Sequence, residues 1–444
     1  MRHETAIRML FLGVTVLLLG IAPRVEAEER VYTVQKSIEE ALKNNWNVKA
    51  KEERIHEAEA VKAQARADFF PKFSTSYSYT RLDEAKSSEP MNFGAITIPG
   101  SPISVKDNYQ WKGTVAQPVF TGFALLSRYE LGKLGIDEAE LELELEKLDL
   151  ALRVKQAYFG VLEADRGVEV AEKAVQSLQS HVKVARSFYD VGMIPINDLL
   201  KAEVELANAE HDLVKAQNAA RIARASFNIA LARTIDAPVI LEDIQDYRPE
   251  TGAFPAFVNE ALENRPEIAA LEVRLKQTEQ NRRLARSDYM PDISLQYDYI
   301  KEGDEFDLHG SPVHEGNRWQ VMGVLSWTFF EWGKTRNAVR EVDSVRLQLL
   351  QTQSALEDQI RLEIKQAYLD LEEAEENIPK TTKAVEQAEE NLRVSRERYK
   401  AQVATSTEVL DAQTLLTRAL TNYYSALYSH HLARARLERA LGTY

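Results

Sequence analysis

The side chains that carry most enzyme chemistry are few and scattered in this sequence. It contains no cysteine, and its eight histidines do not form a metal-ligand pattern. His430 and His431 are adjacent, so on a helix they point about 100° apart and do not share one face. There is no His-Glu-x-x-His motif, no phosphate-binding glycine loop and no serine elbow. We therefore predict no catalytic residue, no metal site, no cofactor and no enzymatic activity.

Two carboxylates in the C-terminal part are better placed to act together. The spacing of Glu408 and Asp411 puts both on one face of a helix. Two carboxylates on one face give that face a local negative charge, which attracts cations. A local role is the alternative, because Thr405 and Glu408 have the spacing of a capping box, in which both side chains bind free N–H groups at a helix start. The two roles are compatible.

The elements that would position these residues occur twice along the chain. The second half repeats the first in order, as four pairs of similar segments show: 41–50 with 261–270, 65–71 with 285–291, 154–165 with 364–375, and 189–203 with 399–413. Such self-similarity indicates a duplicated structural unit. We predict a first repeat at 28–234, a linker at 235–253 and a second repeat at 254–444.

Each repeat has the same predicted plan: a helix, two strands, a very long helix, a turn and a returning helix. The first helix covers about 34–68 in one repeat and 254–288 in the other, and each ends before a proline, which disfavours the α conformation. The long helix at 123–188 contains no proline, so at 1.5 Å per residue it would reach ~100 Å. Its counterpart contains Pro379, where we expect a kink. The turns are predicted at 189–197 and 399–407.

Four segments alternate between faces as strands do: 71–82, 109–120, 291–302 and 318–330. Each has the ~10 residues that a tilted strand needs to cross a bilayer. We expect these aromatic side chains to face lipid or its interface: Tyr77, Tyr79, Trp111, Tyr297, Tyr299, Trp319 and Trp327. Alternation alone also fits β-hairpins packed on helices in a soluble α+β domain. The long helices favour membrane strands, and because four strands cannot close a barrel, several copies would have to pool them.

The N-terminus has the features of a secretion signal. Basic residues precede an apolar run at 9–22, and Ala27 supplies a small residue at a cleavage point. The run is shorter than the ~20 residues of a spanning helix, so we expect a cleaved signal peptide at 1–27 rather than a retained membrane helix. The net charge of −14 argues against nucleic acid as a partner, because phosphates would be repelled.

The order of these features resembles the TolC family of outer-membrane efflux proteins. The resemblance rests on the duplicated plan, the "ALKNN" and "ALENRPE" openings, the "FFP" and "YMP" helix exits and the tip tyrosines, and it covers residues 30–444. It implies a mainly α fold with a small β part that forms, as a homotrimer, a 12-stranded β-barrel in the outer membrane of a Gram-negative bacterium. An α-helical barrel would continue it into the periplasm.

The function that the resemblance implies is a passive exit duct of a tripartite efflux pump or type I secretion system. Its partners would be a periplasmic adaptor (a membrane fusion protein), an inner-membrane pump and outer-membrane lipid. Glu408 and Asp411 match the place where the family's tunnel narrows, and Gly192 and Met193 match the tip that family adaptors grip. The resemblance does not identify the cargo.

The resemblance also implies links that hold the periplasmic tips closed. Tyr399 and Asp198 match one such link, and Asn197 lies beside it. Ala404 stands where the family has an arginine, so a second link is missing and closure would be weaker.

Three other classes of protein compete with the duct. A periplasmic coiled-coil adaptor would need one hairpin within a small β domain, whereas this sequence predicts two hairpins and paired strands. A coiled-coil scaffold of the cell envelope would not need strands with tyrosine and tryptophan on one face. An envelope hydrolase would need a catalytic site, for which the sequence offers no candidate.

Overall fold

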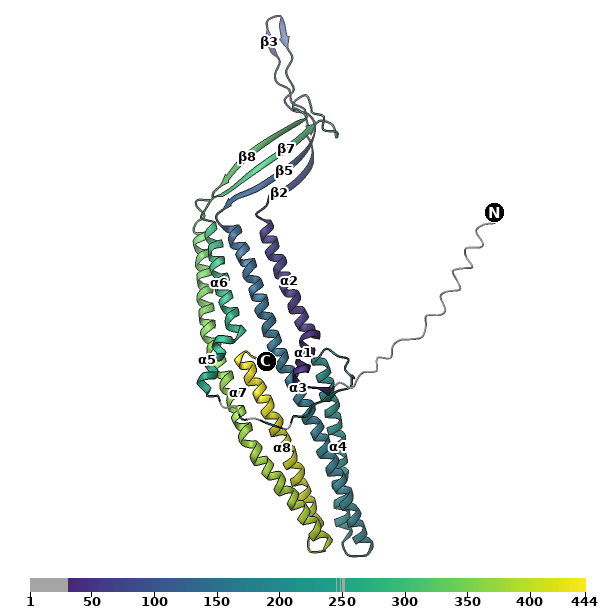
Figure 1. Cartoon of the computed structure of the whole chain (residues 1–444). Helices are drawn as coiled ribbons and strands as arrows, with labels where there is room; N and C mark the ends of the chain where they lie inside the picture. The colour runs from purple at the N-terminus through teal and green to yellow at the C-terminus, as the bar shows by residue number, and fades with distance from the viewer. Residues whose placement is uncertain (1–30, 245, 248, 250–251) are drawn as a thin grey trace, which may run out of the picture.

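The computed structural model describes residues 31–244, 246–247, 249 and 252–444. The expected signal peptide at 1–27 therefore lies outside the described residues, as does part of the expected linker. The molecule is elongated, with a β-sheet at one end and two helical hairpin tips at the other (Figure 1). The predicted mainly α, internally duplicated fold is confirmed.

Each repeat begins with two helices where the sequence predicted one. In the first repeat these are α1 (Val34–Asn44) and α2 (Trp46–Ala67), and in the second α5 (Phe254–Asn264) and α6 (Pro266–Ser287). Asn45 is extended because its side chain caps α2 through the Asn47 N–H and also donates to the Ala230 carbonyl oxygen at 3.2 Å. Arg265 is extended because a proline follows it. The prediction of one continuous helix was wrong at both places.

The two longest helices, α3 (Ala124–Asp190) and α7 (Lys334–Lys400), have 67 residues each, or ~100 Å. They return as α4 (Ile196–Ala230) and α8 (Ser406–Leu441). α7 continues through Pro379, next to which the Thr381 and Thr382 hydroxyls donate to the Ile378 carbonyl oxygen at 3.0 and 2.9 Å. No helix within the described ranges is long and apolar enough to cross a membrane.

One antiparallel sheet joins the two repeats in the order β2-β5-β7-β8. Its strands are β2 (Lys72–Arg81), β5 (Asp107–Thr121), β7 (Asp292–Gly303) and β8 (Asn317–Ser326). The strand predicted at 318–330 was too long, because Ser326 pairs with Asp292, the first residue of β7, and no partner remains beyond it. A register shift between Pro118 and Phe120 bends β5 where it leaves the sheet.

Two small sheets complete the fold. A hairpin of β3 (Met91–Phe93) and β4 (Ile96–Ile98) projects beyond the main sheet (Figure 1). At mid-height, β1 (Val31–Tyr32) pairs in parallel with β6 (Ile240–Leu241).

The main apolar core lies around the middle of α3. Tyr158, Phe227, Leu150 and Leu231 are fully or almost fully buried there. The Tyr158 hydroxyl donates to the Glu242 carbonyl oxygen at 2.6 Å, which fixes the chain just after β6. Smaller clusters hold α5 to α7 and α8, and α7 to α8 at the tip. The sheet and the tips are therefore held at fixed positions along one continuous helical body.

Candidate functional site

One face of the sheet is covered with aromatic side chains. The register pairs Tyr77 with Trp111 and Tyr299 with Trp319, and residues that pair directly share a face. The rings of Tyr297 and Trp319 are 6.4 Å apart, and 67% of Trp319 is exposed. Six of the seven predicted aromatics lie on this face: Tyr77, Tyr79, Trp111, Tyr297, Tyr299 and Trp319.

Trp327, the seventh predicted aromatic, is not on a strand. It follows the end of β8, where its indole N–H donates to the Tyr289 carbonyl oxygen at 3.2 Å. It therefore lies where the sheet meets α6, outside β8 although inside the strand predicted at 318–330, and its expected contact with lipid or the interface stays a prediction.

The opposite face of the sheet is polar and is centred on Asp298. This side chain is fully buried and accepts hydrogen bonds from Thr114 at 2.7 Å and Gln320 at 2.9 Å. Gln296 also donates to it, and the Lys112 ammonium lies 3.0 Å away. Sequence reasoning missed this cluster, because only the register of β5 against β7 brings Lys112 and Thr114 of the first repeat to Asp298 of the second.

At the hairpin tips, Tyr399 points inward. It is 4% exposed, and its ring lies 4.9 Å from that of His181 and 5.6 Å from that of Phe188. Its hydroxyl lies near Ser406, and the expected link to Asp198 is not formed as a hydrogen bond in this structure. Burial raises the pKa of Tyr399 above its ordinary value, and the negative charge of Asp198 raises it further. Asp198 is therefore near, and Asn197 beside it is exposed.

The two candidate carboxylates lie in the first turns of α8. Glu408 forms the predicted capping box with Thr405, whose hydroxyl accepts from the Glu408 N–H at 3.3 Å. The Arg398 guanidinium donates to the second Glu408 oxygen at 3.2 Å. Asp411 is exposed. Glu408 is thus bound on two sides within its own hairpin, whereas Asp411 presents its carboxylate to solvent.

The tip of the first hairpin turns at Gly192. Its φ of +75° suits glycine, and the Met193 N–H donates to the Phe188 carbonyl oxygen at 2.9 Å, which closes the end of α3. Met193 is 54% exposed. The second tip has the same turn, with Gln402 at a φ of +62°. The first hairpin therefore presents an apolar side chain at the end of the molecule.

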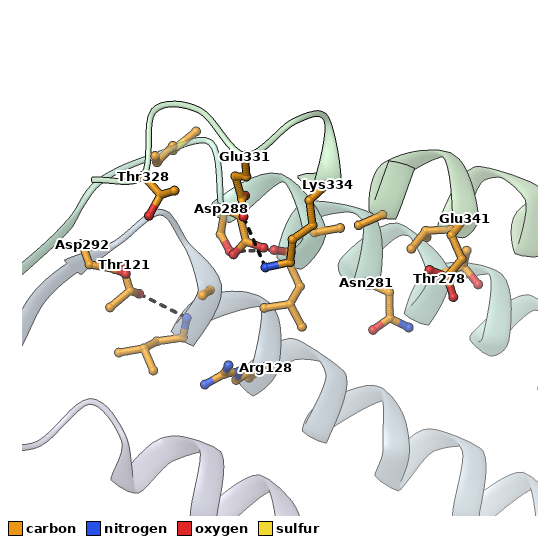
Figure 2. A pocket seen from close by; sticks show the side chains of 18 of the residues that line it. Thr121, Arg128, Thr278, Asn281, Asp288, Asp292, Thr328, Glu331, Lys334 and Glu341 are labelled. Carbon is orange, nitrogen blue, oxygen red and sulfur yellow. Dashed lines mark hydrogen bonds and ion pairs between the residues drawn. The ribbon is translucent and has the colours of Figure 1, made fainter. Parts of the chain in front are cut away.

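A polar cavity of about 860 Å³ lies below the sheet, between α3, α6 and α7 (Figure 2). Its acidic side chains include Asp288, Asp292 and Glu331, and Arg128 and Lys334 offset part of their charge. Glu331 is held by the Lys334 ammonium at 3.3 Å and by the Thr335 hydroxyl at 2.7 Å. The cavity therefore lies where the strands of the sheet join the helices, and polar side chains line it.

Among the residues that the structure places, no three His, Asp or Glu side chains are grouped so as to hold a metal ion. His431 stacks on Phe159 with ring centroids 5.0 Å apart, and its neighbour His430 is buried. His431 therefore packs between α8 and α3, whereas His430 lies beside Glu375 of α7 and Tyr247.

Comparisons with known proteins agree on one family. A family described as "Outer membrane efflux protein" matches residues 37–233 and 257–443, one match in each repeat. Alkaline protease secretion protein AprF of Pseudomonas aeruginosa is 23% identical over 346 residues, 74% of this chain and 69% of that protein. Cobalt-zinc-cadmium resistance protein CzcC of Cupriavidus metallidurans is 23% identical over 414 residues, 92% of this chain and 90% of that protein.

Solved structures share the fold. The structure of CusC, described as forming a transmembrane channel, has a TM-score of 0.77 at 17% identity and covers 93% of this chain and 92% of its own. The Campylobacter jejuni CmeC outer membrane channel has a TM-score of 0.77 at 18% identity, with coverages of 92% and 85%. At such identities the likeness concerns the fold.

Proposed function

Because the chain belongs to the outer membrane efflux protein family, we propose that three copies form a channel through the outer membrane and periplasm, the passive exit duct of a tripartite pump or secretion system. The observation that carries the proposal is the sheet: one aromatic face, one polar face, and unpaired edges at β2 and β8. Unpaired edges are costly in lipid. Joining β8 of one copy to β2 of the next removes them and gives twelve strands in three copies.

In this assembly the aromatic face contacts lipid and the polar face lines the lumen. Tyr77, Tyr79, Trp111, Tyr297, Tyr299 and Trp319 would lie against acyl chains or at the interface. The network around Asp298 would then face the water-filled passage. The helices carry this passage on through the periplasm to the tips.

At the tips we assign the constriction to Glu408 and Asp411, and the control of tip spacing to Tyr399, Asp198 and Asn197. Asp411 is the stronger contributor, because its carboxylate is exposed while Glu408 is bound by Arg398. Gly192 and Met193 would contact a periplasmic adaptor, which links the duct to an inner-membrane pump. Relatives of this fold are named for protein secretion and for metal resistance, which supports a duct whose cargo is chosen by the pump.

Two measurements test the proposal. Light scattering corrected for bound detergent should give about three times the mass of one chain without its expected signal peptide, and a monodisperse monomer would contradict it. In a planar bilayer, Glu408→Ala with Asp411→Ala should weaken cation preference. Glu386→Ala with Glu389→Ala is the matched control, because it removes the same charge from the exposed face of α7. Equal loss of preference in both pairs would place the constriction elsewhere.

A further inference from the structure

A buried polar contact joins the two hairpins just above the tips. His181 of α3 and Ser406, the first residue of α8, have their Nε2 and Oγ atoms 2.8 Å apart and share a hydrogen bond. His181 is 6% exposed and Ser406 is completely buried. The contact connects the first repeat to the second, because α3 and α8 belong to different repeats.

A second polar contact lies beside it and involves α7 as well as α3 and α8. The Arg396 guanidinium of α7 donates to the Ser177 hydroxyl of α3, and that hydroxyl donates to the Gln413 side-chain oxygen of α8. Arg396 has no carboxylate within ion-pair distance among the described residues, and burial lowers its pKa. The interface between the hairpins therefore carries a positive charge and no neighbouring negative one in direct contact.

We propose that His181 is a positioning residue of the periplasmic tips: as a neutral imidazole it ties the first hairpin to the start of α8, and on protonation it lets the tips separate. The inference rests on the proposed function, in which the spacing of the tips controls the duct. It adds a contact that the structure contains to the residues Tyr399 and Asp198, which form no hydrogen bond with each other here.

The charges around His181 determine the direction of the response. Arg396 and Tyr399 face His181 from α7. Ser406 and Gln413 line the interface from α8. The negative charge of Asp198 of α4 acts on Tyr399. Burial, and then the positive charge of Arg396, lower the pKa of His181 from 6.5 to about 4. Because the pKa of the packed state is depressed, the contact is intact above pH 6.5 and is lost as the pH falls toward 4.

The test measures the separation of the hairpins directly. The chain contains no cysteine, so spin labels at Asp190→Cys and Lys400→Cys, at the ends of α3 and α7, are unique. Labelled chain is mixed with excess unlabelled chain, and the distance is measured by pulsed electron resonance in detergent. We expect longer distances on acidification, with a midpoint between pH 6.5 and about 4.

Three variants make the result decisive. His181→Gln can still bond to Ser406 but cannot take a proton, so its distance should not change with pH. Ser406→Ala should lengthen the distance already at neutral pH, and the exposed His211→Gln should respond like the parent chain. A pH response that persists in His181→Gln, or a parent chain without one, would overturn the proposal. The measurement does not depend on conduction or on trimer formation, so failure of the proposed duct remains distinguishable.

Discussion

The helices α3 and α7 hold equivalent places in the two repeats and have equal length, yet α3 buries nineteen residues and α7 only ten. The difference follows from their neighbours. α3 is packed by α1, α2, α4, α6 and α8, whereas α7 is packed by α5, α6 and α8. α3 is therefore the centre of the protomer and α7 lies at its margin.

The marginal helix α7 exposes apolar side chains to solvent. Leu347, Leu362 and Leu369 of α7 are 59%, 51% and 45% exposed. Phe159, the counterpart of Leu369 in α3, is 6% exposed. Duplication thus supplied two similar helices, and their different surroundings gave one a role in the core of the protomer and left the other with an apolar face that a second copy could cover.

The largest expected difference between counterparts is in the sheet, at Asp298 and Ser78. Asp298→Ser should destabilise the protein by about 3–5 kcal/mol, because the Lys112 charge loses its fully buried partner. The half-buried donors Thr114 and Gln320 also lose their acceptor. Ser78→Ala, at the exposed counterpart, should stay within about 0.5 kcal/mol. Thermal unfolding in detergent, followed by circular dichroism, compares them. Similar losses of stability in both variants would show that the hydrogen bonds of Asp298 contribute little to folding.

Because α3 is buried and α7 is exposed, we expect truncations in α3 to lower the stability of the protomer and truncations in α7 to weaken the assembly. Phe159→Ala should cost about 3–5 kcal/mol of protomer stability, because it opens a cavity beside Tyr158 and His431. Leu369→Ala should change protomer unfolding little and instead promote dissociation of the assembly on dilution, seen as a lower mass by light scattering. If Leu369→Ala leaves dissociation unchanged, this part of α7 is not covered by another copy.

The two faces of the sheet should differ in both repeats. Val115→Arg and its counterpart Leu325→Arg should each cost about 2–4 kcal/mol if their face meets lipid at mid-depth. Ser76→Arg, on the polar face, should be much milder. Thr114 is unsuitable as this control because its hydroxyl donates to Asp298. Folded protein recovered in outer membranes is the readout, and equal recovery of all three variants would argue against a lipid-facing surface.

The smallest expected effect is at the starts of the returning helices. Thr405→Ala removes one half of the capping box of α8 and should cost about 1 kcal/mol. Its counterpart Pro195 makes no side-chain cap, so Pro195→Ala should matter less to the first turn of α4. Hydrogen exchange at the amide of Glu408 should become faster in Thr405→Ala only. Unchanged exchange there would mean that packing alone holds the turn.

Periodicity and self-similarity predicted the duplication, the strands and the long helices, because these depend on patterns local to the sequence. One of the two bonds that hold the break at Asn45, the bond to the Ala230 carbonyl oxygen, is remote in sequence and could not be predicted from the local pattern. The break before Pro266 did have a local signal. The Asp298 cluster and the His181–Ser406 contact depend on register and packing between repeats, which neither repeat specifies alone.

Pro379 of α7 has a mechanical consequence. Proline has no N–H, so one hydrogen bond of the helical ladder is absent there, and the counterpart in α3 is Glu169, which interrupts nothing. α3 is therefore an unbroken, stiff helix from the sheet to its tip, whereas α7 can bend more easily at Pro379. We expect a sideways load on the second tip to bend α7 at Pro379 and to reach the membrane end attenuated, while a load on the first tip is transmitted along its full length.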